Sequence, residues 1–580
     1  MIYSISSSLP TFKNLVLSPG INLIVVDMGP NATEGQTRNR SGKSSVLEIV
    51  HFLLGANCPP DSIFRKAALA DFSFSMRLDV GSAVVTVQRS GAEPYKVCIE
   101  TDAEGWPPDL QEQFSGKTAQ VSNDAWKDML GRLTFGLPDS SQRGKYAPTY
   151  RALISYFARR ASKGAYADPF RNAAQQKRWD TQMSMSFLLG LDWTLARDFQ
   201  VVRDEEEEID ALKRSSSKGV LGSLVGKAAD LRSDVARHED ECLSKKTRLD
   251  NLQVLPDYRE REQQADEMAQ RLAQIRGERV AAKRFHTQLK NSLLAENPPT
   301  TDDLFDLYNA AMVQLPEAVV QSFQEARIFH ESVITNRRGY LQQQLQETET
   351  SIAAMTGEET VLQSRFSDAM RTLTASKAFD QYSALQQDLT RCEEETALLR
   401  ERLKLAEALE TKRTQNRANR AELQIRLQQD LHDRFDRVKR AMVVFSNVSR
   451  YLYEANPGSL HVADSPNGLD LNIDIQGSSS KGITLAKILC FDLTLMDIVK
   501  PGPGFLLHDS HAFDGVDSRQ TAAVLRLADR LTRDQGFQYT ATINSNDVPA
   551  ELTHDFVADH RVNVDLSDDP ESGGLFGIRF

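Results

Sequence analysis

The stretch DMGPNATEGQTRNRSGKSS, residues 27–45, decides how the chain is interpreted. A phosphate-binding loop follows the pattern G-x-x-x-x-G-K-[ST]. Gly42, Lys43 and Ser44 fit the end of that pattern, whereas Thr37 stands where its first glycine should be. That glycine mainly relieves crowding at a tight turn, so Thr37 weakens the match without removing the anion site.

The flanking sequence supplies the elements that such a loop needs. The run INLIVV at 21–26 is unbroken and apolar, which predicts a strand buried on both faces. The run SVLEIVHFLLG at 45–55 keeps helical apolar spacing up to Gly55, a predicted helix stop. Backbone N–H groups and the helix N-terminus would hold phosphate, Lys43 would reach the β and γ phosphates, and Ser44 would ligate magnesium. The alternative is an ordinary strand, loop and helix with a chance GKS.

Composition limits the compartment and the class. The chain has 580 residues, a net charge of −11 and five widely separated cysteines without a C-x-x-C pair, which indicates neither a disulfide framework nor a zinc site. A reducing cytoplasm is therefore the expected location. The N-terminus lacks a basic region followed by an apolar core, and no apolar run is long enough for a membrane span, so we expect no membrane association.

Positive charge is concentrated in one segment. Residues 143–178 contain nine lysines and arginines and a single acid, Asp168. Such a run is typical of a surface that contacts phosphates of DNA; the alternatives are a solvated face or an intramolecular partner for acidic segments.

The middle of the chain changes period. Mostly apolar positions, with several polar ones among them, recur in alternating steps of three and four at 231–252 and 265–293, and again at 345–403 with a slip of register near Ser376. This is the pattern of coiled-coil seams. Pro256 is expected to kink the first arm, and Pro298, Pro299 and Pro316 mark the tip of an antiparallel hairpin.

An antiparallel hairpin would bring the two ends of the chain together. We therefore predict an α/β fold in which the N- and C-terminal lobes form one composite head with a long antiparallel coiled-coil hairpin inserted between them; the alternative is two separate domains on a rod. The predicted domains are an N-terminal lobe at 1–195, an ascending arm at 196–294, a tip at 295–325, a descending arm at 326–439 and a C-terminal lobe at 440–580.

The C-terminal lobe supplies a second half of the site. The run GFLLHDS at 504–510 is an apolar strand that ends in Asp509, as expected of a Walker B strand with its magnesium-associated acid. The preceding GSSSKGITLAKILCFDLTLMDI at 477–498 opens an apolar helix with small polar residues and glycines, a second anion site at a helix N-terminus.

In this order of motifs the chain resembles the ABC-type ATPase heads of the SMC, RecN and RecF group, and within it the bacterial coiled-coil ATPases of three-component defence-type systems. The resemblance implies ATP and Mg²⁺ as cofactors. It places the phosphate loop at Asn39, Gly42, Lys43, Ser44 and Ser45, and it makes Ser480, Lys481 and Gly482 the signature segment that touches the γ phosphate of the opposite subunit.

The resemblance also assigns the remaining site residues. Asp509 would be the Walker B acid, residues 514–517 the loop that crosses between heads, and Ser44, Gln182 and Asp509 the metal-associated residues, with Gln175 and Gln176 competing for the role of Gln182. Two positions depart from the family: Ser510 replaces the catalytic glutamate, and Asn544 stands where a histidine usually senses the γ phosphate.

Serine is a poor general base, so hydrolysis is expected to be slow or to use another group. The catalytic candidates are Asp509, Ser510 and His511; His508 and Asp514 are nearby alternatives, and a hydrogen-bonded structural role is the simpler reading of each histidine.

The sequence thus predicts an SMC-like protein that binds and slowly hydrolyses ATP, dimerises through its heads, and acts on DNA in genome maintenance or anti-phage defence together with partner subunits. The alternative is a non-catalytic scaffold, stabilised by nucleotide, that recruits an effector protein.

Overall fold

The structure is a computed structural model that describes residues 1–28, 43–114, 117–139, 141, 143–217, 227–251, 259–295, 317–371, 378–453, 457–475, 481–567 and 572–578. The chain divides into two compact units. Unit 1 comprises Met1–Val201, Leu315–Val320 and Arg420–Phe580, and unit 2 comprises Val202–Gln314 and Gln321–Asn419. None of the described helices is both long enough and apolar enough to cross a membrane.

Unit 1 contains a six-stranded antiparallel sheet built from the N-terminal part of the chain. Its strand order is β2 (Leu15–Val16), β1 (Ile2–Ser7), β4 (Ser73–Val80), β5 (Ala83–Ser90), β6 (Lys96–Thr101) and β7 (Thr118–Ser122). In β4, Phe74, Met76, Leu78 and Val80 are buried while the residues between them are partly or fully exposed. This alternation is the signature of a sheet with one face in the core.

A second sheet in unit 1 is parallel and composite. Its strand order is β10 (Phe505–His508), β11 (Gln538–Asn544), β3 (Ile21–Asp27) and β12 (Leu566–Ser567). Six consecutive residues of β3 are buried, which confirms the strand predicted for INLIVV. Because β3 comes from the N-terminal part and the other three strands come from the C-terminal part, the two lobes do complete one α/β unit.

Helices and one hairpin complete unit 1, with α13 packed on β10 and α14 on β11 and β3. The longer helices are α1 (Lys43–Leu53), α3 (Asn123–Phe135), α5 (Arg178–Leu188), α12 (Phe435–Arg450), α13 (Lys481–Ile498) and α14 (Ser518–Gln535). The shorter ones are α2 (Pro108–Gln111), α4 (Tyr150–Ile154) and α15 (His554–His560), and the hairpin pairs β8 (Ser459–Ser465) with β9 (Gly468–Asp474). Helix α6 (Trp193–Ser217) begins in unit 1 and ends in unit 2.

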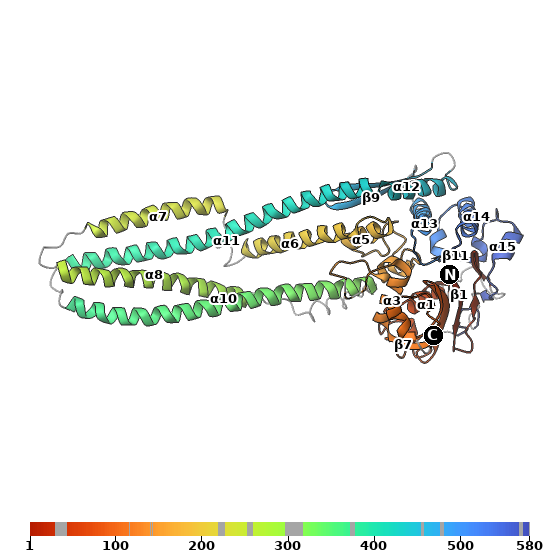
Figure 1. Ribbon diagram of the computed structural model, residues 1–580, viewed down its shortest axis with the longest axis horizontal. Helices are drawn as coiled ribbons and strands as arrows, with labels where there is room; N and C mark the ends of the chain where they lie inside the picture. Colours follow the sequence, from red (N-terminus) through yellow and green to blue (C-terminus); the bar gives the residue numbers. More distant parts are fainter. Residues whose placement is uncertain are drawn as a thin grey trace. The chain divides into compact units, whose positions relative to one another are not determined.

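Unit 2 is built from long helices that lie side by side (Figure 1). They are α7 (Ala228–Asp250), α8 (Arg259–Ala295), α10 (Glu317–Arg371) and α11 (Ala378–Asp433). The part of α11 from Arg420 onward belongs to unit 1. Helix α7 runs antiparallel to α11, because Arg232 pairs with Glu407 and Glu239 with Arg400. Helix α8 runs antiparallel to α10, because Arg271 pairs with Glu358 and His286 with Glu349.

The predicted single hairpin is wrong in one respect, because α8 also runs alongside α11. Tyr382 donates to Asp266 at 2.6 Å, and a Cβ on Gly277 would lie 3.8 Å from Glu394. These contacts advance together along both helices, so α8 is parallel to α11 and therefore antiparallel to α7. The chain reverses between α7 and α8, where only a kink at Pro256 was expected; Pro256 and most of the predicted tip, 296–316, lie outside the described residues.

The burial of α8 explains why periodicity did not reveal this reversal. The predicted seam residues Ala265, Leu272, Ile275 and Leu289 are buried, as expected. Ala269, Ala273 and Gly277 are buried as well, which widens the covered face beyond a single seam. A heptad pattern identifies a face that needs covering but not the number of helices that cover it.

The cysteines also differ from expectation. Cys242 of α7 and Cys392 of α11 form a disulfide with their Cα atoms 5.7 Å apart. The prediction of no disulfide rested on spacing along the chain, and the pair is 150 residues apart. Only the pairing of α7 with α11 brings them together.

Candidate functional site

Helix α1 has the form expected of the helix that follows a phosphate loop. The residues that give the run at 45–55 its helical apolar spacing are all buried: Val46, Leu47, Ile49, Val50, Leu53 and Leu54. Gly55 has φ +84°, which confirms it as the helix stop. Ser44 is exposed and Ser45 is half-buried in the first turn. Asn39, Gly42 and the side chain of Lys43 lie outside the described residues, so their roles stay predictions.

The strands of the parallel sheet end at one edge. At this edge β3 ends with Asp27 and β11 ends with Asn544, and Asp509 directly follows β10. Neighbouring strands are about 4.8 Å apart, and ligands of open α/β sheets bind at this edge. Asp27 forms an ion pair with Arg561, and Asn544 donates to Asp547.

Asp509 is the buried carboxylate of this edge, with 1% of its surface exposed. Its Oδ1 atom accepts from the backbone N–H of His511 at 3.1 Å and thereby caps a short helix, η8 (Ser510–Phe513). The Nδ1 atom of the half-exposed His511 lies 3.5 Å from Oδ2. Burial, together with the charges of Asp509 and Asp492, raises the pKa of Tyr166, which keeps this phenol neutral. Ser510 is partly exposed beside them.

A fully buried polar network lies behind Asp509. Asp492 of α13 accepts from Arg159 Nε at 2.6 Å and from Nη2 at 2.8 Å, and its Oδ2 atom lies 3.1 Å from His508 Nε2. His508 Nδ1 in turn lies 3.1 Å from the hydroxyl of Tyr539. The network therefore joins α13, β10 and β11 to the segment that carries Arg159. Burial alone would lower the Arg159 pKa, but the Asp492 carboxylate more than offsets this and raises it.

The network overturns one prediction for the basic segment. Arg159 is not available to DNA, since its remaining N–H groups donate to carbonyls of the loop at 165–171. Three other arginines of the run are also engaged inside the chain: Arg143 with Asp128, Arg151 with Leu54 and His51, and Arg160 with Glu48. Four of the nine basic residues of the segment thus bond within their own chain.

The segment at 157–162 connects the strand of Asp509 to the helix of Ser44. Leu507 N donates to Phe157 O at 2.8 Å, so this segment adds to the parallel sheet beside β10. Ser162 Oγ donates to Glu48 of α1 at 3.0 Å. His51 of α1 also contacts the segment, because its Nε2 atom lies 2.7 Å from Ala158 O. Both halves of the predicted site are therefore fixed to one short piece of chain.

The start of α13 packs against the turn that precedes α14. Lys481 Nζ lies 3.8 Å from Asp514 Oδ2, and both side chains are exposed. A Cβ on Gly482 would lie 2.3 Å from the carbonyl oxygen of Gly515, so only glycine allows this approach. The predicted signature segment and crossing loop are thus neighbours. Ser480 lies outside the described residues.

Gln182, the candidate metal residue, bonds to the β8–β9 hairpin. It is buried in α5, and its Nε2 atom donates to Asn467 O at 2.9 Å and to Leu469 O at 2.8 Å. This contact holds the turn of the β8–β9 hairpin. Gln176 accepts from Asn172 N at 2.8 Å and donates to Asp180 at 3.0 Å. The metal role of Gln182 stays a prediction.

Sequence reasoning missed Asp492, Tyr166, Glu48 and Ser162. Asp492 carried a signal, because a carboxylate inside the apolar helix ILCFDLTLMDI has to find a buried partner. No comparable signal marked the segment at 157–162, whose partners lie more than one hundred residues away.

A family model described as "Uncharacterised protein conserved in bacteria (DUF2326)" matches residues 448–580. No curated protein matches the sequence.

Two Smc head domains are among the solved structures that are similar to this chain. One is the Smc head domain with a coiled coil and joint from Pyrococcus yayanosii, at 13% identity and a TM-score of 0.35, covering 94% of this chain and 92% of that chain. The other is the Smc head domain with an extended coiled coil, bound to the C-terminal domain of ScpA, from Pyrococcus furiosus, at 9% identity and a TM-score of 0.32, covering 94% and 90%.

Proposed function

We propose that unit 1 binds ATP with Mg²⁺ at the carboxyl edge of the parallel sheet. The observation that carries this proposal is the segment at 157–162, which is bonded both to β10 and to α1 and so ties Asp509 to the helix that begins at GKS. Phosphates would lie on the α1 N-terminus with Asn39, Gly42, Lys43 and Ser45. Ser44 and Asp509 would hold the metal, with Gln182 as the further candidate ligand.

We further propose that hydrolysis is slow. A buried carboxylate that caps η8 is well placed to hold a metal, but the next residue, Ser510, cannot act as a general base at neutral pH. His511 is half-exposed and 3.5 Å from Asp509, so its imidazole can reach a water at the metal. Ser510→Glu should therefore accelerate turnover, whereas His511→Ala should abolish it if this imidazole is the base.

Association of two heads follows from the separation of the two anion sites on different helices. We propose that Ser480, Lys481 and Gly482 of one chain meet the nucleotide bound by the other, in a two-fold arrangement. Ligands that bind only the closed dimer stabilise it by mass action, so ATP should promote association and ADP should not. Ser480→Arg should leave ATP binding intact and prevent association, as judged by sedimentation with a non-hydrolysable analogue.

DNA and partner subunits complete the proposal. An SMC-like protein in the cytoplasm, acting on DNA in genome maintenance or defence, agrees with the order of motifs. The burial of Arg159 removes one of the nine basic residues from a DNA surface at 143–178. This favours keeping the second candidate, a nucleotide-stabilised scaffold that recruits an effector, which Ser510 also supports.

Nucleotide titration tests the central proposal. Lys43→Ala should weaken ATP affinity at least about 100-fold, since a bound phosphate loses its main counter-charge. Asp509→Asn should instead remove the Mg²⁺ dependence of binding. Lys96→Ala, on β6 of the antiparallel sheet, is the matched control and should change neither property. Undiminished affinity in Lys43→Ala would reject the site.

A further inference from the structure

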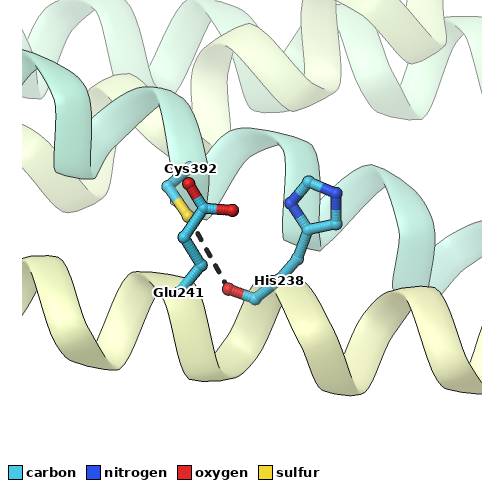
Figure 2. A group of neighbouring side chains, drawn as sticks. All are labelled: His238, Glu241 and Cys392. Atoms are coloured by element: carbon cyan, nitrogen blue, oxygen red, sulfur yellow. Dashed lines mark hydrogen bonds between the residues drawn. The ribbon is translucent and has the colours of Figure 1, made fainter.

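A cluster of metal-ligating side chains lies in unit 2, far along the sequence from the proposed nucleotide site. It joins His238, Glu241 and Cys242 of α7 to Cys392 of α11, and Figure 2 shows three of these residues. His238 and Cys242 are four residues apart, so they lie on one face of α7. That face is the one turned to α11, as the disulfide between Cys242 and Cys392 requires.

The ligand atoms of this cluster are close together. One nitrogen of His238, one carboxylate oxygen of Glu241 and the sulfur of Cys392 all lie within 4.8 Å of one another. Cys392 Sγ also lies 3.6 Å from the backbone carbonyl of His238, the contact drawn in Figure 2. Cys242 Sγ is bonded to Cys392 Sγ in the disulfide and lies 3.4 Å from Thr396 Oγ1.

An independent observation points to a ligand at this place. The Nδ1 atom of His238 is buried and has no hydrogen-bond partner among the residues that the structure describes. A buried imidazole nitrogen without a partner is costly, because it has lost its hydrogen bond to water. A cation at the cluster would supply the missing partner.

We propose that the reduced chain binds one Zn²⁺ at this cluster, through His238 Nδ1 and the thiolates of Cys242 and Cys392. Two sulfurs and one imidazole are a ligand set that zinc prefers, at about 2.3 Å for sulfur and 2.0–2.1 Å for nitrogen. The ion replaces the two thiol protons, which pass to solvent, and no electron is transferred. The disulfide is the oxidised state of the same pair, and the two states exclude each other, because bonded sulfurs are not thiolates.

Glu241 completes the tetrahedral set. Its carboxylate now pairs with Lys245 at 2.9 Å, and this exposed ion pair has to open before the oxygen can turn to the ion. Exposed pairs of this kind stabilise a helix only slightly, so opening this one is a small penalty. We therefore expect Glu241→Gln to weaken binding less than loss of either thiol.

The bound ion would link α7 to α11 through Cys242 and Cys392, which are 150 residues apart in sequence. Closing so long a loop restricts the unfolded chain, and the bound ion would also hold the register of α7 against α11. The inference concerns unit 2 alone and does not depend on the proposed nucleotide site.

Cobalt titration of the full chain, reduced with a phosphine, tests the proposal. Co²⁺ bound by thiolates absorbs in the near ultraviolet, and a tetrahedral site adds visible bands. We expect one Co²⁺ per chain, displaced by Zn²⁺. Cys242→Ser and Cys392→Ser should each abolish the near-ultraviolet band of a dithiolate site. His238→Gln should weaken binding at least about tenfold, since even outer-shell partners change metal affinity by roughly 10–100-fold.

A control variant and a check of folding separate loss of the metal site from loss of structure. Cys98→Ser, on β6 in unit 1, keeps all cluster ligands and should bind Co²⁺ as the unmodified chain does. Circular dichroism checks that every variant keeps its helices. The proposal is overturned if the reduced chain shows no thiolate band, if the band is lost in Cys98→Ser, or if affinity is unchanged in His238→Gln.

Discussion

Asp492 illustrates how one residue can hold several elements together. Its carboxylate is fully buried, accepts two bonds from Arg159, which is 333 residues away in sequence, and contacts His508. Removing one member of a buried ion pair leaves an uncompensated charge in a low-dielectric environment. Residues of α13, β10 and the segment at 157–162 all depend on this single group.

Asp492→Asn should therefore lower the free energy of unfolding of unit 1 by about 3–5 kcal/mol. Chemical denaturation measures this change, followed by a signal that belongs to unit 1, such as the fluorescence of Trp126, which is fully buried there. Asp514→Asn removes a carboxylate whose side chain is half-exposed and should stay within about 0.5 kcal/mol of the unmodified chain. Equal losses in the two variants would contradict a structural role for the network.

His51 predicts a pH dependence of stability. Burial, followed by the charges of Arg160 and Arg151, holds the pKa of His51 well below 6.5 in the folded chain. The unfolded chain binds a proton at about pH 6.5, so the free energy of unfolding is fully retained above that value and falls as the pH drops toward the folded pKa. His51→Gln should flatten this fall between about pH 7.5 and 5.5.

The control for His51 is His554→Gln, because His554 is exposed at the start of α15. This variant should keep the pH dependence of the unmodified chain. Denaturation curves at several pH values compare the three proteins, and a fall that persists unchanged in His51→Gln would assign it to other groups.

At the scale of elements, the start of α13 can pack against the turn before α14 because Gly482 has no side chain. A Cβ there would meet the carbonyl oxygen of Gly515 at 2.3 Å, and backbone cannot move aside as the end of a flexible side chain can. Overpacking of this kind typically destabilises by about 1–3 kcal/mol. The turn before α14 and the first turn of α13 have to shift together.

Gly482→Ala should accordingly increase amide hydrogen exchange in the first turns of α13 and α14. The matched control is Gly339→Ala in α10, where a Cβ would meet nothing within 4 Å. Alanine favours a helix interior over glycine by about 0.5–1 kcal/mol, so the control should slow exchange locally or leave it unchanged. Unaltered exchange at α13 in Gly482→Ala would show that the turn can adapt.

Elements were more predictable from the sequence than the contacts between them. The β3 strand, helix α1 and the strand before Asp509 follow from short apolar runs, whose burial depends on local pattern. The reversal between α7 and α8 does not, since the same heptads suit one long hairpin or a folded-back bundle. The resemblance assigns Gln182 to the metal site, whereas its bonds to Asn467 O and Leu469 O depend on a hairpin far along the chain.

At the scale of the whole molecule, unit 1 is made from both ends of the sequence. The side chain of Gln538 bonds both the N–H and the carbonyl of Ile2, and β3 lies between β11 and β12. Neither part contains a complete parallel sheet. The core of unit 1 should therefore form only when both parts are present.

Two fragments, residues 1–201 and 420–580, should consequently copurify when they are produced together, and each should aggregate when produced alone. Exposed edges of apolar strands such as β3 and β11 explain the aggregation. A fragment 1–201 that is monomeric and unfolds cooperatively by itself would contradict this expectation. Covalent linkage of the two fragments through a short flexible linker should restore folding without unit 2.

The composite sheet also means that strands of one sheet are synthesised at very different times. Ile2 leaves the ribosome long before its partner Gln538, which is 536 residues later, and at about 5–20 residues per second this interval is roughly half a minute to two minutes. Throughout it the apolar β3 segment has no parallel neighbour to pair with. The nascent chain is thus a natural client for chaperones that shield unpaired strands, and slow translation of the long helices prolongs that dependence.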